Sequence, residues 1–204
     1  MCIIITPPIT YRYVDLGLPS GTKWAAQNVG ARKPSDAGLY FQWGDTSGYT
    51  YSQIGKDKQF NWSDYKFSIN GSDTNFSKYA TAGTTLELED DAAHINMGGN
   101  WHMPTPEQIK ELTANTTTAW TSNEGVNGIT FTSKKDSSKS IFIPAAGSAR
   151  NGSIFSSGIN GLIWSFILFW DNVSYGQYLV FYSASASLNY TYRCDGLSVR
   201  GVIG

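Results

Sequence analysis

The sequence predicts an α+β protein with two short helices, small antiparallel sheets and long ordered loops. Charged residues make up only 15% of the chain, well below the usual quarter, and Gly, Ser, Thr, Asn and Tyr replace them. That composition favours turns and short strands. Helical patterns occur only in the middle, with strand-and-turn patterns on both sides. With 204 residues we expect a single domain over 13–204, preceded by an N-terminal arm or leader remnant over 1–12.

The N-terminal part of the expected domain predicts short strands separated by turns, over 11–45. Residues 46–83 are rich in Gly, Ser, Asp, Asn and Tyr without a lasting period, which predicts a long ordered loop region. From residue 119 to the end, strand and turn patterns return. Within them, Gly125 and Gly128 fit the turn region of a hairpin.

Two helices are expected between these parts. For the first, within 84–99, Thr84 or Thr85 is the expected N-cap and Gly98 the expected stop. The second lies within 104–114, where Thr105 is the N-cap, Pro106 takes the first helical position and Gln108 completes a capping box. Ile109 and Leu112 give this second helix one apolar face.

Charge and cysteine content exclude several classes of protein. The net charge of −1 gives no electrostatic basis for binding nucleic acid or an anionic membrane. Cys2 and Cys194 allow one disulfide at most, so a disulfide framework is excluded. The first ten residues lack a basic region and are interrupted at Pro7, which does not fit a signal peptide. Export after removal of a leader, or by another route, stays open.

The stretch WSFILFWDN, residues 164–172, is unusually apolar for this chain. Its apolar run over 162–170 is too short for a membrane-spanning helix, which needs about 20 residues, so we expect no membrane insertion. In a strand, Ile163, Ser165, Ile167 and Phe169 would share one face, and the alternating residues from Trp164 to Trp170 the other. Both faces are mostly apolar. Either the strand is buried on both sides, or one apolar face is exposed to bind something.

The tryptophans are expected to anchor the core, as large aromatic side chains usually do. We expect this of Trp24, Trp43, Trp101, Trp120 and Trp164. Core anchoring is less clearly expected of Trp170, because it precedes Asp171 and Asn172, where the chain turns.

Catalytic and metal-binding patterns are weak. His94 is either a metal ligand with Asp90 or Asp91 or a partly exposed helix residue, and a single histidine lacks a closed ligand set. His102 fits a structural turn residue. Cys194 has only Arg193 as a basic neighbour, which does not favour a nucleophile. We therefore predict no catalytic residues, no metal site and no cofactor.

Several segments together resemble one family. They are 13–31, 37–45, 88–112, 120–133, 141–165 and 196–202, with a gap over 46–83. The most specific parts are GGNWHMPTPEQ (98–108) and IFIPAAGSARNG (141–152). The family that they resemble is the Fibrobacter succinogenes major paralogous domain of Bacteroidales surface proteins. It is similar to the C-type lectin-like fold in its formylglycine-generating-enzyme branch, so the resemblance implies that fold.

A subset of these domains resembles the variable proteins of diversity-generating retroelements, in which a reverse transcriptase mutates adenines near the end of the gene. Their framework ends in a GxSVR block, matched here by Gly196, Ser198, Val199 and Arg200. The resemblance implies a diversified region over about 164–200. Residues 165–200 contain no Lys, Glu or Met, which fits Asn codons mutated only at adenine. Trp170 and Gln177 do not fit and would be fixed or differently encoded.

Departures from the family bear on activity. Many relatives carry Cys where this chain has Gln27 and Thr116, which implies loss of a paired bridge. Formylglycine-generating enzymes need a reactive cysteine pair near the C-terminal end, and only Cys194 is present there. The calcium-dependent sugar-binding triplets of classical lectins are also absent.

We therefore expect a non-catalytic receptor-binding protein on a bacterial cell surface or a phage virion, with a protein or glycan ligand. The alternative is an invariant cell-surface module of the same fold, either pilus-associated and structural or carbohydrate-binding. The expected ligand contacts are Phe166, Ile167, Phe169, Asp171, Asn172, Tyr175, Tyr182, Tyr190, Tyr192, Cys194 and Asp195.

Overall fold

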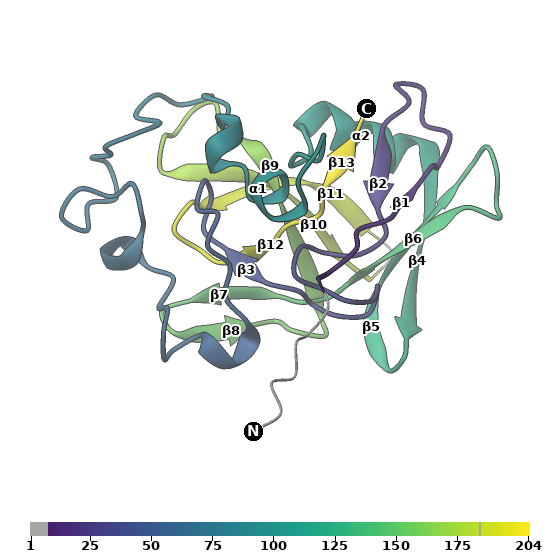
Figure 1. Ribbon diagram of the computed structural model, residues 1–204, viewed down its shortest axis with the longest axis horizontal. Helices are drawn as coiled ribbons and strands as arrows, with labels where there is room; N and C mark the ends of the chain where they lie inside the picture. The colour runs from purple at the N-terminus through teal and green to yellow at the C-terminus, as the bar shows by residue number, and fades with distance from the viewer. Residues whose placement is uncertain (1–7, 184) are drawn as a thin grey trace.

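The computed structural model describes residues 8–183 and 185–204 and has the expected mixed α+β character, with few helices and several small sheets. Figure 1 shows the loop-rich segment 46–83 on the left and the hairpin of β4 and β5 on the right. Most of the expected N-terminal arm, residues 1–7, lies outside the described residues. The strands are β1 Tyr13–Val14, β2 Lys23–Ala25, β3 Tyr40–Phe41, β4 Thr116–Asn123, β5 Val126–Ser133, β6 Ser140–Pro144, β7 Ser148–Arg150, β8 Ser153–Phe155, β9 Asn160–Leu168, β10 Tyr175–Tyr182, β11 Ser185–Tyr192, β12 Leu197–Ser198 and β13 Val202–Ile203. The α-helices are α1 Ala92–Met97 and α2 Pro106–Asn115, and the 3-10 helices are η1 Tyr51–Gln53, η2 Trp62–Asp64 and η3 Leu88–Asp90.

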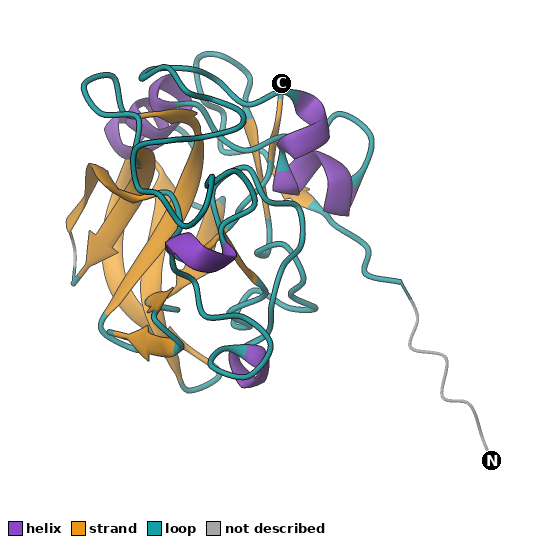
Figure 2. Ribbon diagram, turned by 90° about the vertical axis from the view of Figure 1, so that its left-hand side faces the viewer, coloured by secondary structure: helices purple, strands orange, loops and turns teal. Residues whose placement is uncertain are grey.

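The largest sheet joins the two ends of the chain. Its five strands lie in the order β11-β10-β9-β12-β3, and they form a layer along one side of the molecule, with loops opposite (Figure 2). Strands β9, β10 and β11 are antiparallel neighbours, whereas β12 runs parallel to β9 with Ser198 opposite Ile163. A second sheet pairs β13 with β2, with Val202 opposite Trp24. Strands from the N- and C-terminal parts of the chain are therefore paired in both sheets.

Strand β9 carries the apolar stretch and is buried on both faces over its central residues. Ile163 and Trp164 are 1% and 0% exposed and pack into two different core clusters. The Trp164 indole N–H donates to the Phe41 carbonyl at 2.8 Å, and that of Trp43 donates to the Ser165 carbonyl at 3.0 Å. These bonds satisfy the polar atom of each buried indole. The first part of WSFILFWDN is therefore core.

The other tryptophans divide into two groups. Trp24 and Trp43 are fully buried, as expected. Trp101 and Trp120 are only partly buried, so the expectation of full core anchoring is too strong for them.

The first helix is shorter than the sequence predicts, and its N-cap is a different residue. Thr84 and Thr85 are extended, because the Thr84 carbonyl accepts from Leu168 N–H at 2.9 Å and Thr85 forms a bridge with Ile167. Pairing with the end of β9 thus replaces helix formation there. Asp91 caps α1 instead, by accepting from the backbone of its first turn. Gly98, with φ of 73°, ends the helix as expected.

The second helix forms as predicted. The Thr105 side chain accepts from Gln108 N–H at 3.1 Å, and Gln108 Oε1 accepts from Thr105 N–H at 2.9 Å. Both bonds of the expected capping box are therefore present, and Pro106 takes the first turn. Ile109 and Leu112 are buried against the sheet. Among the described residues, no helix combines the length and the apolar character that crossing a bilayer requires.

The hairpin of β4 and β5 turns at Glu124 and Gly125, where φ is 51° and 82°. Two successive positive φ angles are typical of a type I′ turn. Gly128 does not belong to the turn, contrary to the prediction, because it lies within β5 opposite Thr121.

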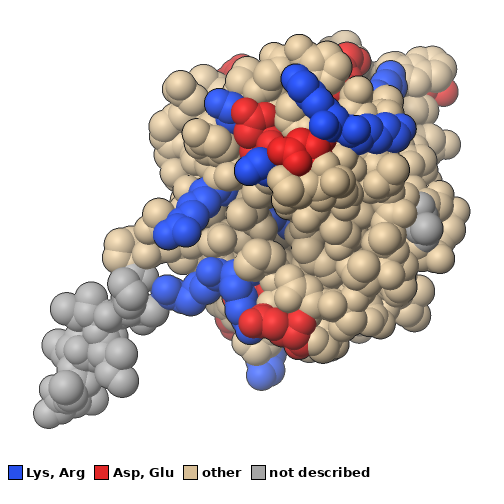
Figure 3. Space-filling model, turned by 90° about the vertical axis from the view of Figure 1, so that its right-hand side faces the viewer, with Lys and Arg blue, Asp and Glu red and all other residues tan. Residues whose placement is uncertain are grey.

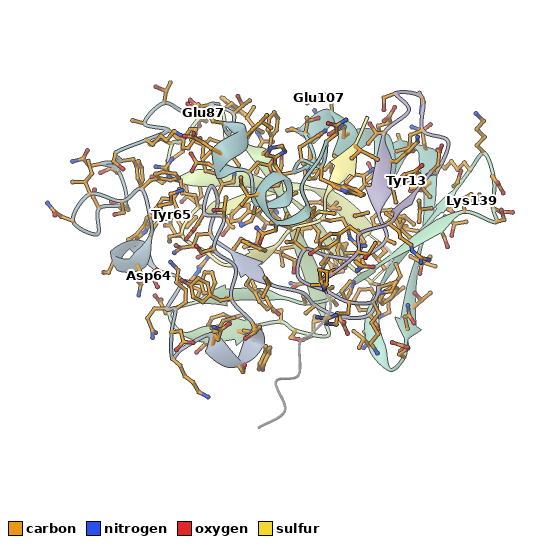
Figure 4. All side chains as sticks on the ribbon, in the orientation of Figure 1. Tyr13, Asp64, Tyr65, Glu87, Glu107 and Lys139 are labelled. Atoms are coloured by element: carbon orange, nitrogen blue, oxygen red, sulfur yellow. The ribbon has the colours of Figure 1, made fainter. Side chains whose placement is uncertain are left out.

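The segment 46–83 contains only 3-10 turns and isolated bridges, as the sequence predicts. Its order comes from buried aromatic side chains, which are Phe60, Tyr65, Phe67, Phe76 and Tyr79. Figure 4 places Asp64, Tyr65 and Glu87 in the same half of the molecule, away from Tyr13 and Lys139.

A fully buried arginine joins this segment to the C-terminal part of the chain. The Arg193 guanidinium lies 3.4 Å from the centroid of the Phe76 ring and donates to the Tyr79 carbonyl at 2.8 Å. Burial lowers the pKa of Arg193 to about 10. The contact holds the loop segment against the turn that follows β11.

Arg200 of the GxSVR block has a similar role between strands. Its side chain is fully buried, and it donates to the carbonyl of Ala25 at 2.9 Å and to that of Phe142 at 2.7 Å. Burial lowers the pKa of Arg200 to about 9. One side chain thus connects β2, β6 and the segment between β12 and β13.

Candidate binding surface

Aromatic side chains gather where β9 ends and the β10–β11 hairpin begins and ends. Tyr175 and Tyr192 are opposite each other on β10 and β11, and their rings stack with centroids 4.8 Å apart and an interplanar angle of 18°. Phe169 stacks on Tyr190 at 4.0 Å and 21°. The Tyr175 and Tyr190 rings then meet edge to face at 5.4 Å. Cross-strand pairing therefore holds four rings in one cluster.

Two tryptophans extend this cluster at its ends. Trp170 lies 5.3 Å from Phe169, and Trp62, from η2, meets Tyr192 edge to face at 5.7 Å. Trp170 is 71% exposed, Tyr190 47% and Tyr192 37%. Aromatic side chains left in water at adjacent positions mark interaction sites, because each offers a large area at low entropic cost. We call this set the aromatic surface: Trp62, Phe169, Trp170, Tyr175, Tyr190 and Tyr192.

An ion pair between the exposed Arg150 and the buried Asp195 supports one end of the aromatic surface. Arg150 Nε donates to Asp195 Oδ1 at 2.7 Å, and a second guanidinium nitrogen donates to the other carboxylate oxygen. Thr191 Oγ1 donates to that same oxygen at 2.6 Å. The hydrogen bonds to Asp195 raise the pKa of Arg150, whose guanidinium lies 5.5 Å from the centre of the Tyr192 ring. This geometry is the bidentate form that fixes both side chains.

Two shallow hollows flank the stacked rings. One, of about 230 Å³, lies between Trp62, Tyr192 and the Arg150–Asp195 pair. The other, of about 220 Å³, is lined by Phe169, Gln177, Leu188, Asn189 and Tyr190. Both are smaller than the pockets of about 300–1,000 Å³ that enclose small-molecule ligands. They are of a size to receive single side chains of a macromolecular partner.

Most of the expected contact residues lie at this surface or beside it. Tyr190 and Tyr192 are exposed within the aromatic surface, and Phe169 and Tyr175 are half-buried within it. Asp171 and Asn172 are exposed at the adjoining turn. Phe166 and Ile167 are half-buried, and Phe166 also packs on the core. Tyr182 is exposed but lies at the other end of β10, beside Trp120 and Ile159.

Two of the expected contacts, Cys194 and Asp195, are buried, at 3% and 1% exposed. Both line the hollow between Trp62 and Tyr192, where they offer a ligand little contact area. Asp195 instead holds Arg150, as described above. Burial raises the pKa of the Cys194 thiol, which keeps it protonated at neutral pH, and protonated thiols are poor nucleophiles.

The sequence did not point to Trp62, Trp170 or Arg150 as surface residues. Trp170 carried a usable signal, since it stands directly before the polar pair that turns the chain. For Trp62 and Arg150 the sequence offers no such signal, because they contact Tyr192 from the loop segment and from β7, which are far away in the sequence.

The histidines make backbone contacts in the structure. A ring nitrogen of His94 lies 3.2 Å from the Trp101 carbonyl, and one of His102 lies 2.9 Å from that of Met103. Asp91 is occupied as the helix cap, and its Oδ2 also accepts from Met103 N–H at 2.8 Å. Asp90 accepts from Lys66 at 2.6 Å. These contacts favour the structural reading of both histidines.

Within 8–183 and 185–204, Glu87, Glu89 and Asp90 are the one group of side chains close enough together to share a metal ion. The Lys78 ammonium already lies 2.6–2.8 Å from all three carboxylates. Burial alone would raise the pKa of Asp90, but hydrogen bonds from Lys66, Lys78 and Tyr79 lower it. Lys66 and Lys78 therefore balance two of the three negative charges in the cluster.

Basic and acidic groups stand close together among mostly uncharged atoms on the face shown in Figure 3. The net charge of the chain is −1.

Comparison with known proteins adds no identification: no family model, no curated protein and no solved structure matches this chain.

Proposed function

We propose that this chain is a non-catalytic ligand-binding protein whose C-terminal region presents a diversified binding surface generated by a diversity-generating retroelement. In this proposal the chain has the C-type lectin-like fold of the Fibrobacter succinogenes major paralogous domain. Residues 164–200 supply the variable surface and the rest of the chain its framework. Its ligand is a macromolecule on another cell or particle.

One observation carries the proposal, which is the distribution of burial within 164–200. Trp164 and Ser165 at the start, and the segment 196–200 at the end, are all buried. Between them, exposed residues such as Asp171, Tyr190 and Tyr192 are interspersed with buried ones such as Leu179 and Phe181. A surface that is replaced repeatedly needs this arrangement, because changes at exposed positions leave the core packing intact.

The arrangement of the framework strands also supports the proposal. The short strands β12 and β13 pair with β3 and β2 from the N-terminal part of the chain. Arg200 adds hydrogen bonds from the end of the GxSVR block to β2 and β6. The C-terminal end of the region proposed to vary is thus attached to the rest of the chain by backbone pairing and by a buried side chain.

The rings of the aromatic surface favour a protein ligand over a sugar. Carbohydrate-binding platforms need coplanar rings with free faces. Here Tyr175 and Tyr192, and Phe169 and Tyr190, cover one another's faces. They present ring edges and phenolic hydroxyls, as antibody paratopes do. The alternative function, an invariant pilus-associated or carbohydrate-binding surface module, is therefore less well supported.

The gene tests the diversification directly. We expect an Asn-rich near-copy of codons 164–200 beside a reverse transcriptase gene, and sequence differences between sister isolates confined to codons 166–195. Sequencing the locus in several isolates measures both. Codons 92–115, which span α1 and α2, are the internal control and should be invariant. A locus without a near-copy and without the reverse transcriptase gene would contradict the proposal.

A further inference from the structure

Strand β11 is an unprotected edge of the largest sheet. It pairs with β10 on one side, and it is the last strand in the order β11-β10-β9-β12-β3. It spans eight residues, SASLNYTY, with no charge and no proline, and none of its residues is buried. The opposite edge, β3, is only two residues long and is covered by a bridge from Tyr40 to Tyr49. Proteins usually block long edges with charges, proline or bulges, since a free edge recruits other strands.

The backbone groups on the outer side of β11 can be assigned from the pairing. Tyr190 N–H donates to the side chain of Asn189 at 2.8 Å, so it does not point at β10. Residues two apart along an antiparallel strand direct their N–H and C=O groups to the same side. Ala186 and Leu188 therefore direct theirs outward with Tyr190. Across the described part of the chain, no other segment takes up these groups.

The hollow beside the edge adds a place for a side chain. Leu188, Asn189 and Tyr190 of β11 line it together with Phe169 and Gln177. A strand added along β11 would place alternate side chains on the face that carries Leu188 and Tyr190. One of these side chains would reach the hollow. In β-strand addition, main-chain hydrogen bonds supply affinity and such hollows supply selectivity.

We infer that the outer edge of β11 binds an extended peptide segment of the ligand by β-strand addition, with one apolar side chain in the hollow between Phe169 and Tyr190. The inference rests on the proposed function, because it names the ligand chemistry of that same surface. Ala186 and Leu188 supply the main-chain donors and acceptors. Backbone recognition of this kind is independent of side-chain identity, so it would persist while the surrounding side chains change.

A second copy of this chain fits the edge less well than a peptide. Helix α2 packs on the sheet mainly over β11. Two β11 strands paired about a two-fold axis would lie about 4.8 Å apart and would place both α2 helices on the same face. Packed helices need about 8–10 Å between their axes. A single extended peptide brings no such helix.

The test uses the full chain and 12-residue peptides selected against it from a displayed random library. We expect the selected peptides to bind, and N-methylation of alternate peptide residues to weaken binding at least tenfold. Ala186→Pro removes an outward N–H without removing a bond to β10 and should weaken binding at least tenfold. Ala186→Ser, which keeps the N–H, is the matched control and should stay within about threefold. Circular dichroism checks that both variants are folded.

Hydrogen exchange gives a second readout on the unaltered protein. The amides of Ala186 and Leu188 should exchange rapidly in the free chain and at least tenfold more slowly with peptide bound. The inference is overturned if no peptide is selected, if N-methylation shows no alternation, or if the two Ala186 variants bind equally. A dimer that Ala186→Pro dissociates would also overturn it. Loss of ligand binding in Trp170→Ala, with the Ala186 variants unaffected, would leave the proposed function standing and refute only this inference.

Discussion

Replacing Arg200 with alanine is expected to lower the free energy of unfolding by about 3–5 kcal/mol. The side chain is fully buried and donates to the carbonyls of Ala25 and Phe142. Alanine leaves a cavity and removes the donor from both carbonyls. Removal of the charge also relieves the desolvation that lowers the pKa of Arg200, and this relief offsets part of that loss.

Chemical denaturation measures this change, and two further variants interpret it. Arg200→Met keeps most of the side-chain volume and so leaves little cavity. Its decrease in the free energy of unfolding should therefore be smaller than that of Arg200→Ala. Arg12→Ala, at an exposed arginine, should change stability by no more than about 0.5 kcal/mol. If Arg200→Ala were as stable as Arg12→Ala, the framework role of the GxSVR block would be wrong.

Replacing Trp170 with alanine is expected to weaken ligand binding by about 2–4 kcal/mol, or roughly 30- to 1,000-fold, without unfolding the chain. Trp170 is 71% exposed and contacts Phe169 at the end of the aromatic surface. An exposed indole buries a large area when a partner covers it, whereas its removal costs the free protein little. Trp170→Ala should therefore weaken ligand binding and leave the stability of the free protein nearly unchanged.

Capture of surface proteins from bacterial cell extracts on the immobilised chain provides the measurement. The wild-type chain should retain a partner that Trp170→Ala loses. Tyr51→Ala is the matched control, since Tyr51 is 64% exposed but lies in η1, outside the aromatic surface. Equal retention by all three proteins would show that the aromatic surface does not bind that partner.

The parts of the fold that depend on local chemistry could be predicted from the sequence. The cap and first turn of α2 follow from Thr105, Pro106 and Gln108, whose bonds form within one turn. The composition of 46–83, which is rich in Gly, Ser, Asp, Asn and Tyr and has no lasting period, likewise indicated an ordered loop region. The first helix was overestimated because Thr84 and Thr85 pair with β9, and such a contact across the chain leaves no local pattern.

The binding surface was predicted only in part for the same reason. Strand alternation and the turn at Asp171 identified the positions where apolar side chains could be exposed. The structure then showed which of these side chains are exposed and which are buried. Asp195 was among the expected contacts, but its side chain is buried, where it accepts hydrogen bonds from Arg150 and Thr191. Trp62 joins the surface through tertiary packing alone. Sequence patterns report faces and turns, whereas this surface is assembled from three separate segments.

The most direct test of the central claim, that a replaceable surface is attached to a fixed framework, compares two displayed libraries by the fraction of members that resist proteolysis. The first library randomises exposed positions: Asp171, Asn172, Asn189, Tyr190 and Tyr192. The second randomises the buried flanks: Trp164, Ser165, Leu197, Ser198 and Val199. We predict that most members of the first library resist proteolysis as the wild-type chain does and that few members of the second do. Equal losses in the two libraries would contradict the claim.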